Sequence, residues 1–414
     1  MRKELLIVCD EFPPAFAPRM GYLCKNLPKQ EWHATVVTEK GELTSFDIDV
    51  KDADVYAYDW LKCEGKKSRY VEWLLKFFLT LVFDYKNRWF LRKMRKSLKG
   101  KHFDAVLCSS YNEFPLNVGL RYAKRRGVPC ACDIRDLAEQ GKQDVFRLHQ
   151  INGILGKMVG DVVDVICKKR RNWALKNATD LISVSPWHVD YLKRYNGNSH
   201  LIFNGYDDAL FRPIDIRCDT FKITYTGRMM DKEIRNPELL FEALRDMKDE
   251  CEKMEVEWWC DEKTEETVKN MAEEYGVQTR MRYRGFARHN EMPRVLNEAS
   301  IVLVLSNKTK EIQPHGVMTT KYFEAIGCER PVLLVRSDEA ELSQHIQNMG
   351  SGVACRTKGE VLAFLREKYE EWVREGRTSI SYLQDKSVYS REKESRQFVE
   401  IIERAIHTDT NIQQ

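Results

Sequence analysis

The chain lacks the residue patterns that mark a metal site, an ATPase or a hydrolase. Its twelve cysteines and nine histidines form no C-x-x-C, no histidine cluster and no His/Cys pair, and no paired acidic motif occurs. The sequence therefore predicts no metal and no cofactor. No G-x-x-x-x-G-K-[ST] loop is present, which argues against an ATPase. No Ser-His-Asp pattern that would support a hydrolase is found.

Long apolar runs are also missing. The apolar stretch 73–83 has eleven residues, one of them a Lys, whereas a membrane-spanning helix needs about 20. The N-terminal run Leu5–Cys9 is too short for a signal peptide and favours a first β-strand. Scattered cysteines indicate free thiols in a reducing compartment. We expect a cytoplasmic protein, with a peripheral location at the inner membrane face as an extension of that expectation.

Length and patterning indicate two domains. The 414 residues, 43% hydrophobic and 31% charged, are too many for one ordinary core. Apolar runs alternate with amphipathic stretches and restart after 205–220, which implies parallel, doubly wound sheets. We predict an α/β fold with two Rossmann-like domains facing each other across a cleft (a GT-B arrangement), 1–205 and 206–386, and a helix at 387–406 that packs back on the first. The predicted strands are 5–9, 35–38, 105–109, 130–134, 181–185, 201–203, 223–226, 255–259, 281–283, 301–305 and 332–335.

Positive charge is concentrated in one short segment. The net charge of the chain is +4, but segment 66–101 holds twelve Lys or Arg and two acids, a net charge of +10. Beside the apolar stretch 73–83, this cluster suits an anionic membrane surface. The alternative is a buried helix with a solvated basic flank. We expect no nucleic-acid partner, because the aromatic residues are grouped with aliphatic ones.

The most informative stretch is 315–335. A small polar pair, Thr319-Thr320, opens an apolar helical segment that ends at Gly327, before a Pro-Val strand. A helix start directs N–H groups and the positive end of the helix dipole at one point, which suits a diphosphate. Glu324, one turn into the helix, can accept hydrogen bonds from the two vicinal hydroxyls of a ribose. Together these features predict a nucleotide-sugar site.

This stretch resembles the donor-binding signature of retaining GT-B glycosyltransferases, in particular glycosyltransferase family four. In that family a Glu is followed, after seven residues, by a second Glu, an Ala/Gly-rich segment and a Pro-Val strand. Glu324 matches the second Glu, and Gly316 stands in the place of the first. Some branches of the family read Gly-Val-x-Thr-x-Lys-x-Phe-Glu here, as this chain does. Weaker matches in the same order cover 5–38, 105–137, 181–213, 223–247 and 281–335.

The resemblance implies which residues hold the donor. Glu324 would bind the ribose. The loop before and at the helix start would contact phosphate and sugar through Gly316, Val317, Met318, Thr319 and Thr320.

Cations in segment 225–238 would neutralise the diphosphate. Arg228 matches the Arg of the family, and Lys232 lies one residue before the usual Lys position, which is Glu233 here. Arg235 is a further candidate. Breaking the sugar–phosphate bond leaves negative charge on the diphosphate, which cations and helix N–H groups can stabilise without a metal. The alternative is that Arg228 and Lys232 are solvated loop charges.

Arg135 and Asp136 end a predicted strand that resembles the one leading to the catalytic cleft in the family. Either residue could contact the donor or acceptor sugar, or the two could form an ion pair that caps the strand. Arg19 lies in a loop where the family usually has Gly-Gly. It could supply a cation to the donor phosphates or lie on the surface.

Two further residues are candidate donor contacts. Arg288 follows a segment that, in the family, lies against the nucleotide base, and it could reach the base or the phosphates. His315 precedes the loop that would hold the sugar. A solvated loop Arg and a structural or surface His are the alternatives.

The resemblance implies a hexosyltransferase-type glycosyltransferase that is independent of metal and retains anomeric configuration. It would move a sugar from a nucleotide-sugar donor to a hydroxyl of a glycan or lipid-linked acceptor, in cell-surface polysaccharide or lipid-linked glycan synthesis. Two rivals remain open. One is a nucleotide-sugar epimerase or hydrolase with the same fold, and the other is a non-catalytic scaffold at a membrane surface.

Overall fold

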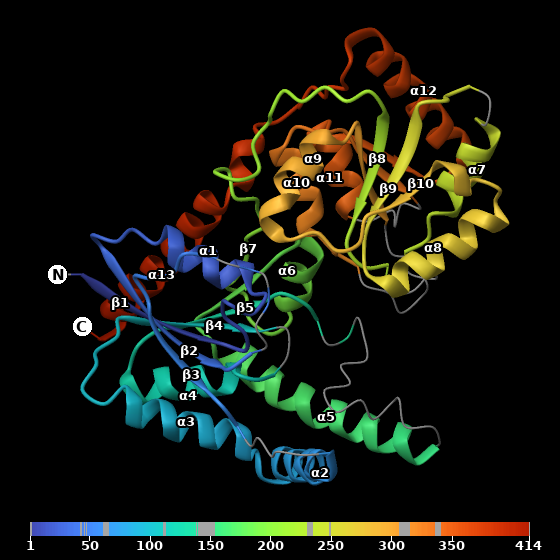
Figure 1. The fold of residues 1–414 in the computed structure, drawn as a ribbon. Coiled ribbons are helices and arrows are strands. Elements are labelled where there is room, and N and C mark those ends of the chain that lie inside the picture. Colours follow the sequence, from blue (N-terminus) through green and yellow to red (C-terminus); the bar gives the residue numbers. More distant parts are fainter. Residues whose placement is uncertain are drawn as a thin grey trace. The chain divides into compact units, whose positions relative to one another are not determined.

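The computed structural model describes residues 2–41, 44, 46, 48–60, 66–110, 113–137, 139, 154–229, 235–247, 250–305, 315–335 and 341–413 (Figure 1). The chain divides into two compact units. Unit 1 comprises Met1–Ile202 and Ser395–Gln414, and unit 2 comprises Phe203–Glu394. The observed division thus lies near the predicted boundaries at 205 and 386.

Unit 1 is built around a parallel sheet. In the described part of the chain its strands are β1 (Lys3–Cys9), β2 (Trp32–Glu39), β3 (Asp54–Tyr58), β4 (Ala105–Ser110), β5 (Cys130–Ile134), β6 (Asp180–Ser183) and β7 (Ser199–Leu201). They lie in the order β3-β2-β1-β4-β5-β6-β7. The helices are α1 (Pro18–Asn26), α2 (Lys66–Phe83), α3 (Tyr85–Ser97), α4 (Leu116–Arg126), α5 (Ile154–Asn177), α6 (Pro186–Leu192) and, from Ser395 onward, α13 (Arg391–Gln413).

Both faces of this sheet are covered. Leu6 and Val8 of β1 pack on one face with α3, α4 and α5, while Leu5 and Ile7 pack on the other with α1 and α13. Successive side chains of a strand point to opposite faces, so a strand covered on both sides is apolar throughout. The last helix contributes Phe398 and other apolar residues to the core of unit 1.

Unit 2 repeats the same plan. Its strands are β8 (Phe221–Thr226), β9 (Met254–Trp259), β10 (Met281–Tyr283), β11 (Ile301–Leu305), β12 (Val332–Val335) and β13 (Gly352–Cys355), in the order β10-β9-β8-β11-β12-β13. Its helices are α7 (Glu238–Asp246), α8 (Glu262–Glu274), α9 (Met292–Glu298), α10 (Thr320–Gly327), α11 (Glu341–Met349) and α12 (Lys358–Glu375). One face packs against α7, α8 and α12, and the other against α9, α10 and α11.

The predicted α/β class is confirmed, since all paired strands described in both sheets are parallel. The strand order of unit 2 reverses between β8 and β11, which pair side by side. In open parallel sheets, ligands bind at the carboxyl ends of strands at such a reversal. None of the helices in the described ranges is both long and apolar enough to cross a membrane.

Candidate functional site

The carboxyl end of β8 forms a tight, well-anchored turn. Gly227 has φ of 96°, in the left-handed region that favours glycine, and its N–H donates to the Trp259 carbonyl at 2.7 Å. The following carbonyl, that of Arg228, accepts from the Tyr225 hydroxyl at 3.0 Å and from the Arg235 guanidinium at 2.7 Å. The turn is thus fixed at the point in unit 2 where a ligand is expected.

Helix α10 begins beside this turn. Thr319 is its N-cap residue, with φ of −71° and ψ of 137°, but its side chain accepts no capping hydrogen bond. Gly316 adopts φ of 76° in the loop before it, and Met318 is buried in the core. Val317, Thr319 and Thr320 are half-buried. A helix start whose N-cap hydroxyl is not used for capping can offer that hydroxyl, with its N–H groups, to an anion.

Lys321 brings α10 into contact with the β8 turn. A Cβ placed on Gly227 would meet the Nζ and Cε of Lys321, so the ammonium lies directly over this glycine. The Nζ also lies 4.9 Å from the centre of the Tyr225 ring. Burial, reinforced by the charge of Arg235, lowers the pKa of Lys321 to about 7. Neither Lys321 nor Arg235 forms an ion pair with a carboxylate of the described residues.

Glu324 lies one turn after Lys321 on the same side of α10. The neighbouring residues Tyr322, Phe323, Ala325 and Ile326 are fully buried in the core, whereas Glu324 is half-buried. Burial raises the pKa of Glu324 to about 7, although the charges of Arg391 and Lys321 oppose the shift. Helical spacing places Glu324 on the side of α10 that carries Lys321, and burial keeps its carboxyl group largely out of water.

Arg228 is the exposed member of the cluster. Its side chain is 69% exposed, and its Nε lies 3.2 Å from Asp261, the N-cap of α8. The guanidinium also lies 6.0 Å from the ring of the exposed Phe286. An exposed pair of this kind contributes little to stability, so the side chain is available to a ligand. Lys232 lies outside the described residues, and its predicted role stays a prediction.

The other two predicted donor residues are exposed on unit 2. His315 is exposed at the turn that includes Gly316. Arg288 is exposed at the start of the short helix His289–Glu291, where its N–H donates to the Glu291 carboxylate at 2.8 Å. Neither side chain is shown to touch Lys321 or Glu324, so their donor contacts remain predictions.

In unit 1, the residues predicted at the end of β5 have different surroundings. Arg135 pairs with Asp10, at the end of β1, with Nη2 3.0 Å from Oδ1. This pair links two strand ends, and the predicted roles of Arg135 and Asp136 stay predictions. Asp136 itself is exposed.

Arg19 is buried, so the predicted alternative of a surface position is wrong. It lies in α1, only 2% exposed, with its Nε 3.0 Å from Asp133 on β5 and its Nη2 donating to the Ile202 carbonyl at 3.0 Å. The guanidinium also covers the ring of Phe398 on α13 at 4.8 Å. The buried Arg19 side chain thus joins α1 to β5 and α13 within unit 1. This geometry favours a structural role over a phosphate contact or a surface position.

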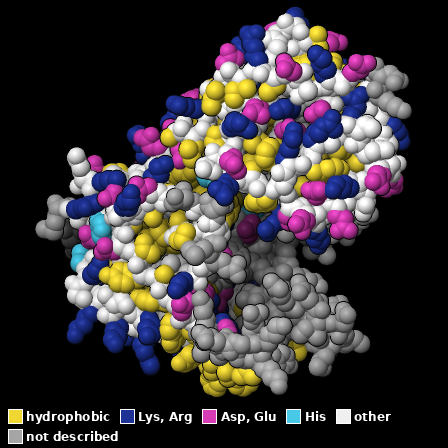
Figure 2. All heavy atoms as spheres, in the orientation of Figure 1, with side chains coloured by type: hydrophobic (Ala, Val, Ile, Leu, Met, Phe, Trp, Pro, Cys, Tyr) yellow, Lys and Arg dark blue, Asp and Glu magenta, His cyan; other side chains and the backbone are white. Residues whose placement is uncertain are grey.

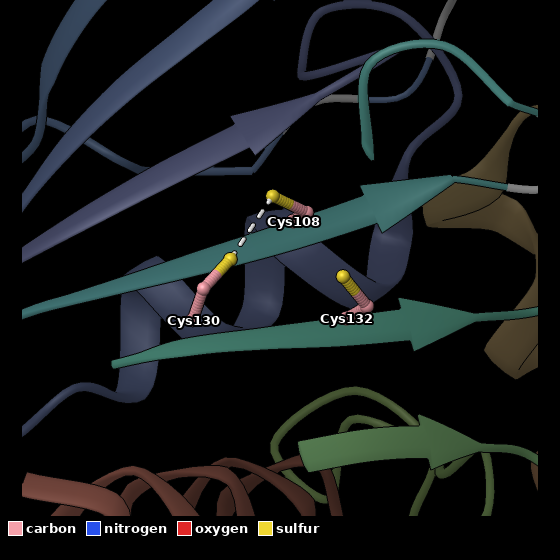
Figure 3. A group of neighbouring side chains, drawn as sticks. All are labelled: Cys108, Cys130 and Cys132. Carbon is pink, nitrogen blue, oxygen red and sulfur yellow. Dashed lines mark hydrogen bonds between the residues drawn. The ribbon is translucent and has the colours of Figure 1, made fainter. Parts of the chain in front are cut away.

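Three cysteines meet in the core of unit 1 (Figure 3). Cys108 on β4 is paired in register with Cys132 on β5, and its Sγ lies 3.7 Å from that of Cys130. All three are fully buried on one face of the sheet, as the two-residue spacing of Cys130 and Cys132 predicts. The Cys108 sulfur fills the space left by Gly119 of α4, whose Cβ would lie 2.2 Å from it. The three sulfurs lie close enough together to hold a metal ion. Their burial in the core, with Cys108 packed against Gly119, is also what apolar packing alone would produce.

The arrangement in unit 2 is suited to an anion. Lys321, Arg235 and Arg228 gather like charge at a strand end beside a helix start, and the one carboxyl on the same helix face is Glu324. The sequence analysis names Arg228, Arg235 and Glu324 as candidate residues, but it assigns no role to Lys321. Its position three residues before Glu324, on one helix face, was the signal that could have revealed it.

No protein-family model and no curated protein matches the sequence. Solved structures do match along the whole chain. Sucrose-phosphate synthase from Thermosynechococcus elongatus aligns with a TM-score of 0.58 and 14% identity, over 99% of this chain and 98% of that one. HepE from Anabaena, in complex with UDP and glucose, aligns with a TM-score of 0.56 and 13% identity, over 99% and 100%.

A structure assigned as a UDP-N-acetylglucosamine 2-epimerase from Listeria monocytogenes aligns with a TM-score of 0.56 and 13% identity, over 96% of this chain and 95% of that one. Transferases and an epimerase thus share this architecture, and at such low identity the likeness concerns the fold alone. The chain has the fold of GT-B glycosyltransferases, with a Rossmann-like sheet in each of its two units.

Proposed function

We propose that the protein is a glycosyltransferase that moves a sugar from a nucleotide-sugar donor to an acceptor hydroxyl, without a metal and with retention of anomeric configuration. The observation that carries the proposal is Lys321. Its ammonium packs on Gly227 at the strand-order reversal of unit 2, without a described carboxylate partner and with Arg235 close enough to repel it. A diphosphate would supply the missing negative charge.

The cations act on the leaving group. As the bond between the anomeric carbon and the diphosphate oxygen breaks, its electron pair passes to that oxygen. Lys321, Arg228 and the N–H groups at the start of α10 would stabilise the charge, which is the main contribution such a site can make. The acceptor oxygen then bonds to the anomeric carbon from the same face, and the departing phosphate takes the acceptor proton. Lys232 would add a further cation.

Glu324 would orient the nucleoside. A carboxylate can accept hydrogen bonds from both hydroxyls of a ribose, and such charge-assisted bonds are strong. Residues Gly316 to Thr320 would hold the phosphates and the sugar. We place Arg288 and His315 near the base and the sugar in this proposal, because the resemblance assigns them there and both are exposed on unit 2.

The acceptor would be a glycan or a lipid-linked intermediate, used in cell-surface polysaccharide or lipid-linked glycan synthesis. The exposed Asp136 of unit 1 is the candidate residue for contact with a sugar there, with Arg135 held beside it by Asp10. The basic segment 66–101 would bring the protein to an anionic membrane from the cytoplasmic side. These assignments follow from the resemblance and from the charge distribution.

The test is binding of a panel of UDP-, GDP-, ADP- and CMP-sugars, first by thermal shift and then by titration calorimetry. Glu324→Ala should weaken the best-binding nucleotide sugar about 10- to 100-fold, because hydrogen bonds to a charged group contribute about 1.5–3 kcal/mol. Glu266→Ala, which removes an exposed acid on α8, is the matched control and should leave binding unchanged.

Turnover separates the enzyme classes. A transferase releases nucleotide faster when an acceptor is present and forms a glycosylated product. A hydrolase releases it equally without acceptor, and an epimerase converts the sugar, as in the Listeria structure's assignment. If Glu324→Ala bound the nucleotide sugar as tightly as the wild type, the ribose contact would be refuted. If the wild-type protein bound no nucleotide sugar, the non-catalytic scaffold would be the remaining hypothesis.

A further inference from the structure

Helix α2 carries an exposed apolar face. Val71, Leu75 and Phe78 are spaced i, i+4 and i+7, so they lie along one side of the helix. Phe83, at its end, is also exposed, and its ring lies 6.1 Å from that of Phe78. Large hydrophobic side chains that line up in this way are unlike isolated exposed residues, because together they form a continuous surface.

Helix α5 carries a second face with the same spacing. Met158, Val162 and Val165 follow the i, i+4, i+7 pattern and are exposed. The exposed fractions of these three residues and of Val71, Leu75 and Phe78 lie between 46% and 64%. The sequence motif at 66–101 does not extend to α5, so this second face is visible only from the structure.

The two helices are joined in unit 1. Arg170 of α5 donates from Nη1 to the Thr80 carbonyl at 2.8 Å and from Nη2 to the Leu81 carbonyl at 2.9 Å. The last carbonyls of a helix lack partners within it, and a cationic side chain is a favourable cap. Arg170 also lies 3.6 Å from Asp84, the residue between α2 and α3. The contacts tie the C-terminal end of α2 to α5, and the apolar faces of both helices stay exposed.

Positive charge borders this surface. Figure 2 shows hydrophobic side chains gathered at the lower edge, where α2 lies in Figure 1, and Lys and Arg side chains beside them, where α3 lies. The exposed cations of α3 and its C-terminal end are Arg88, Arg92, Lys93, Arg95, Lys96 and Lys99. Among the residues of α2 and α5 whose side chains the structure describes, Asp161 is the one exposed acidic residue. The charge balance is therefore strongly positive.

We infer that the exposed apolar faces of α2 and α5 insert into the headgroup region of an anionic lipid bilayer, while the cations of α3 bind its headgroups. Apolar side chains bordered by a basic row have the composition of a helix that lies in a membrane interface. The positive border favours anionic lipid over a second copy of the chain, which would bring like charges together. This deepens the membrane contact of the proposed function, but it does not depend on donor binding.

The test is co-sedimentation with vesicles of phosphatidylcholine, with and without phosphatidylglycerol. The variant Phe78→Glu/Val162→Glu changes one exposed residue on each helix, so it should fold normally, as circular dichroism would check. Its binding to phosphatidylglycerol vesicles should fall about tenfold or more, because each apolar side chain that leaves water for the bilayer adds a favourable free energy of transfer, and the charged Glu side chains lose it. Val373→Glu, on α12 and 63% exposed, is the matched control and should bind like the wild type.

A second variant, Arg92→Glu/Lys93→Glu, should bind less and show a weaker dependence on salt, because it lacks two headgroup contacts. Unchanged vesicle binding by the Phe78→Glu/Val162→Glu variant would overturn the inference, as would a wild type that ignores phosphatidylglycerol. So would a wild-type dimer in solution that the same double variant converts to a monomer. Nucleotide-sugar affinity, measured on the same variants, should not change and tests the proposed function separately.

Discussion

Both units hold cations close to strand ends, but their charges have different surroundings. In unit 1, Arg19 is fully buried and bound to Asp133, and Arg135 is bound to Asp10. In unit 2, Lys321 is packed against Gly227 beside Arg235, and no described carboxylate pairs with either of them. A buried cation with a fixed partner has its electrostatic needs met within the protein.

A half-buried cation held beside another cation is different, because the fold stabilises an arrangement that repels itself. Strained or unfavourable electrostatics of this kind are concentrated at functional sites. The contrast therefore separates structural charges from candidate binding charges by their partners, and residue type alone would not have separated them. The contrast also predicts that removing the two kinds of charge changes the free energy of unfolding in opposite directions.

Removing the structural charge should have the largest effect. Arg19→Met leaves Asp133 fully buried, with the Ser109 hydroxyl as a remaining donor at 2.8 Å. Breaking a buried ion pair in this way should lower the free energy of unfolding by about 3–5 kcal/mol, measured by urea denaturation. Protein that remains folded should bind nucleotide sugar normally.

The matched control is Arg19→Met/Asp133→Leu. Replacing both partners by apolar residues removes the unpaired charge, so most of the lost stability should return. If Arg19→Met instead kept its stability and lost donor affinity, Arg19 would belong to the donor site as the sequence first indicated, and the contrast between the units would fail.

Removing the candidate binding charge should have the opposite effect on stability. Lys321→Met keeps the apolar part of the side chain and removes an ammonium that burial disfavours. The free energy of unfolding should stay the same or rise by about 1–3 kcal/mol. Affinity for UDP-glucose, or for the best binder of the panel, should fall about 10- to 100-fold in calorimetry. Lys269→Met, an exposed position on α8, should alter neither quantity, and a destabilised Lys321→Met with normal affinity would contradict the assignment.

The sequence predicts the central strands of both sheets because they are buried on both faces and read as continuous apolar runs. It misses β3 and β13, each of which lies at one edge of its sheet, whereas the strands at the opposite edges, β7 and β10, overlap the predicted ranges 201–203 and 281–283. Both are short and only partly buried, so they lack a continuous apolar run, and β13 begins with a glycine. Such partly buried edge strands depend on pairing with a neighbour, which a local pattern does not record.

The same limit applies to the site. The start of α10, its end at Gly327 and the following strand are local patterns, and the structure has them where the sequence predicts them. The contact of Lys321 with Gly227 joins residues 94 positions apart, and the pairing of Arg19 with Asp133 joins residues 114 apart. Such contacts depend on the folded sheet order, so the sequence identifies the residue types and leaves their partners undetermined.

The smallest predicted effect is a pH dependence that sharpens the contrast. Lys321 must be protonated to bind a diphosphate, and its pKa in the free protein is about 7 because of burial and Arg235, so affinity should weaken as the pH rises above 7. Glu324 must be ionised to accept ribose hydroxyls, and burial raises its pKa to about 7, so affinity should also weaken as the pH falls below 7. Calorimetry with a nucleotide sugar from about pH 5.5 to about pH 9 should show the highest affinity near pH 7, with a several-fold decline on each side.

Lys321→Arg should remove the decline in affinity at alkaline pH because arginine stays charged, and Glu324→Gln should remove the decline at acidic pH. A flat profile in the wild type would mean that neither group changes its protonation on binding, and unit 2 would then hold its charges for structure, as unit 1 does.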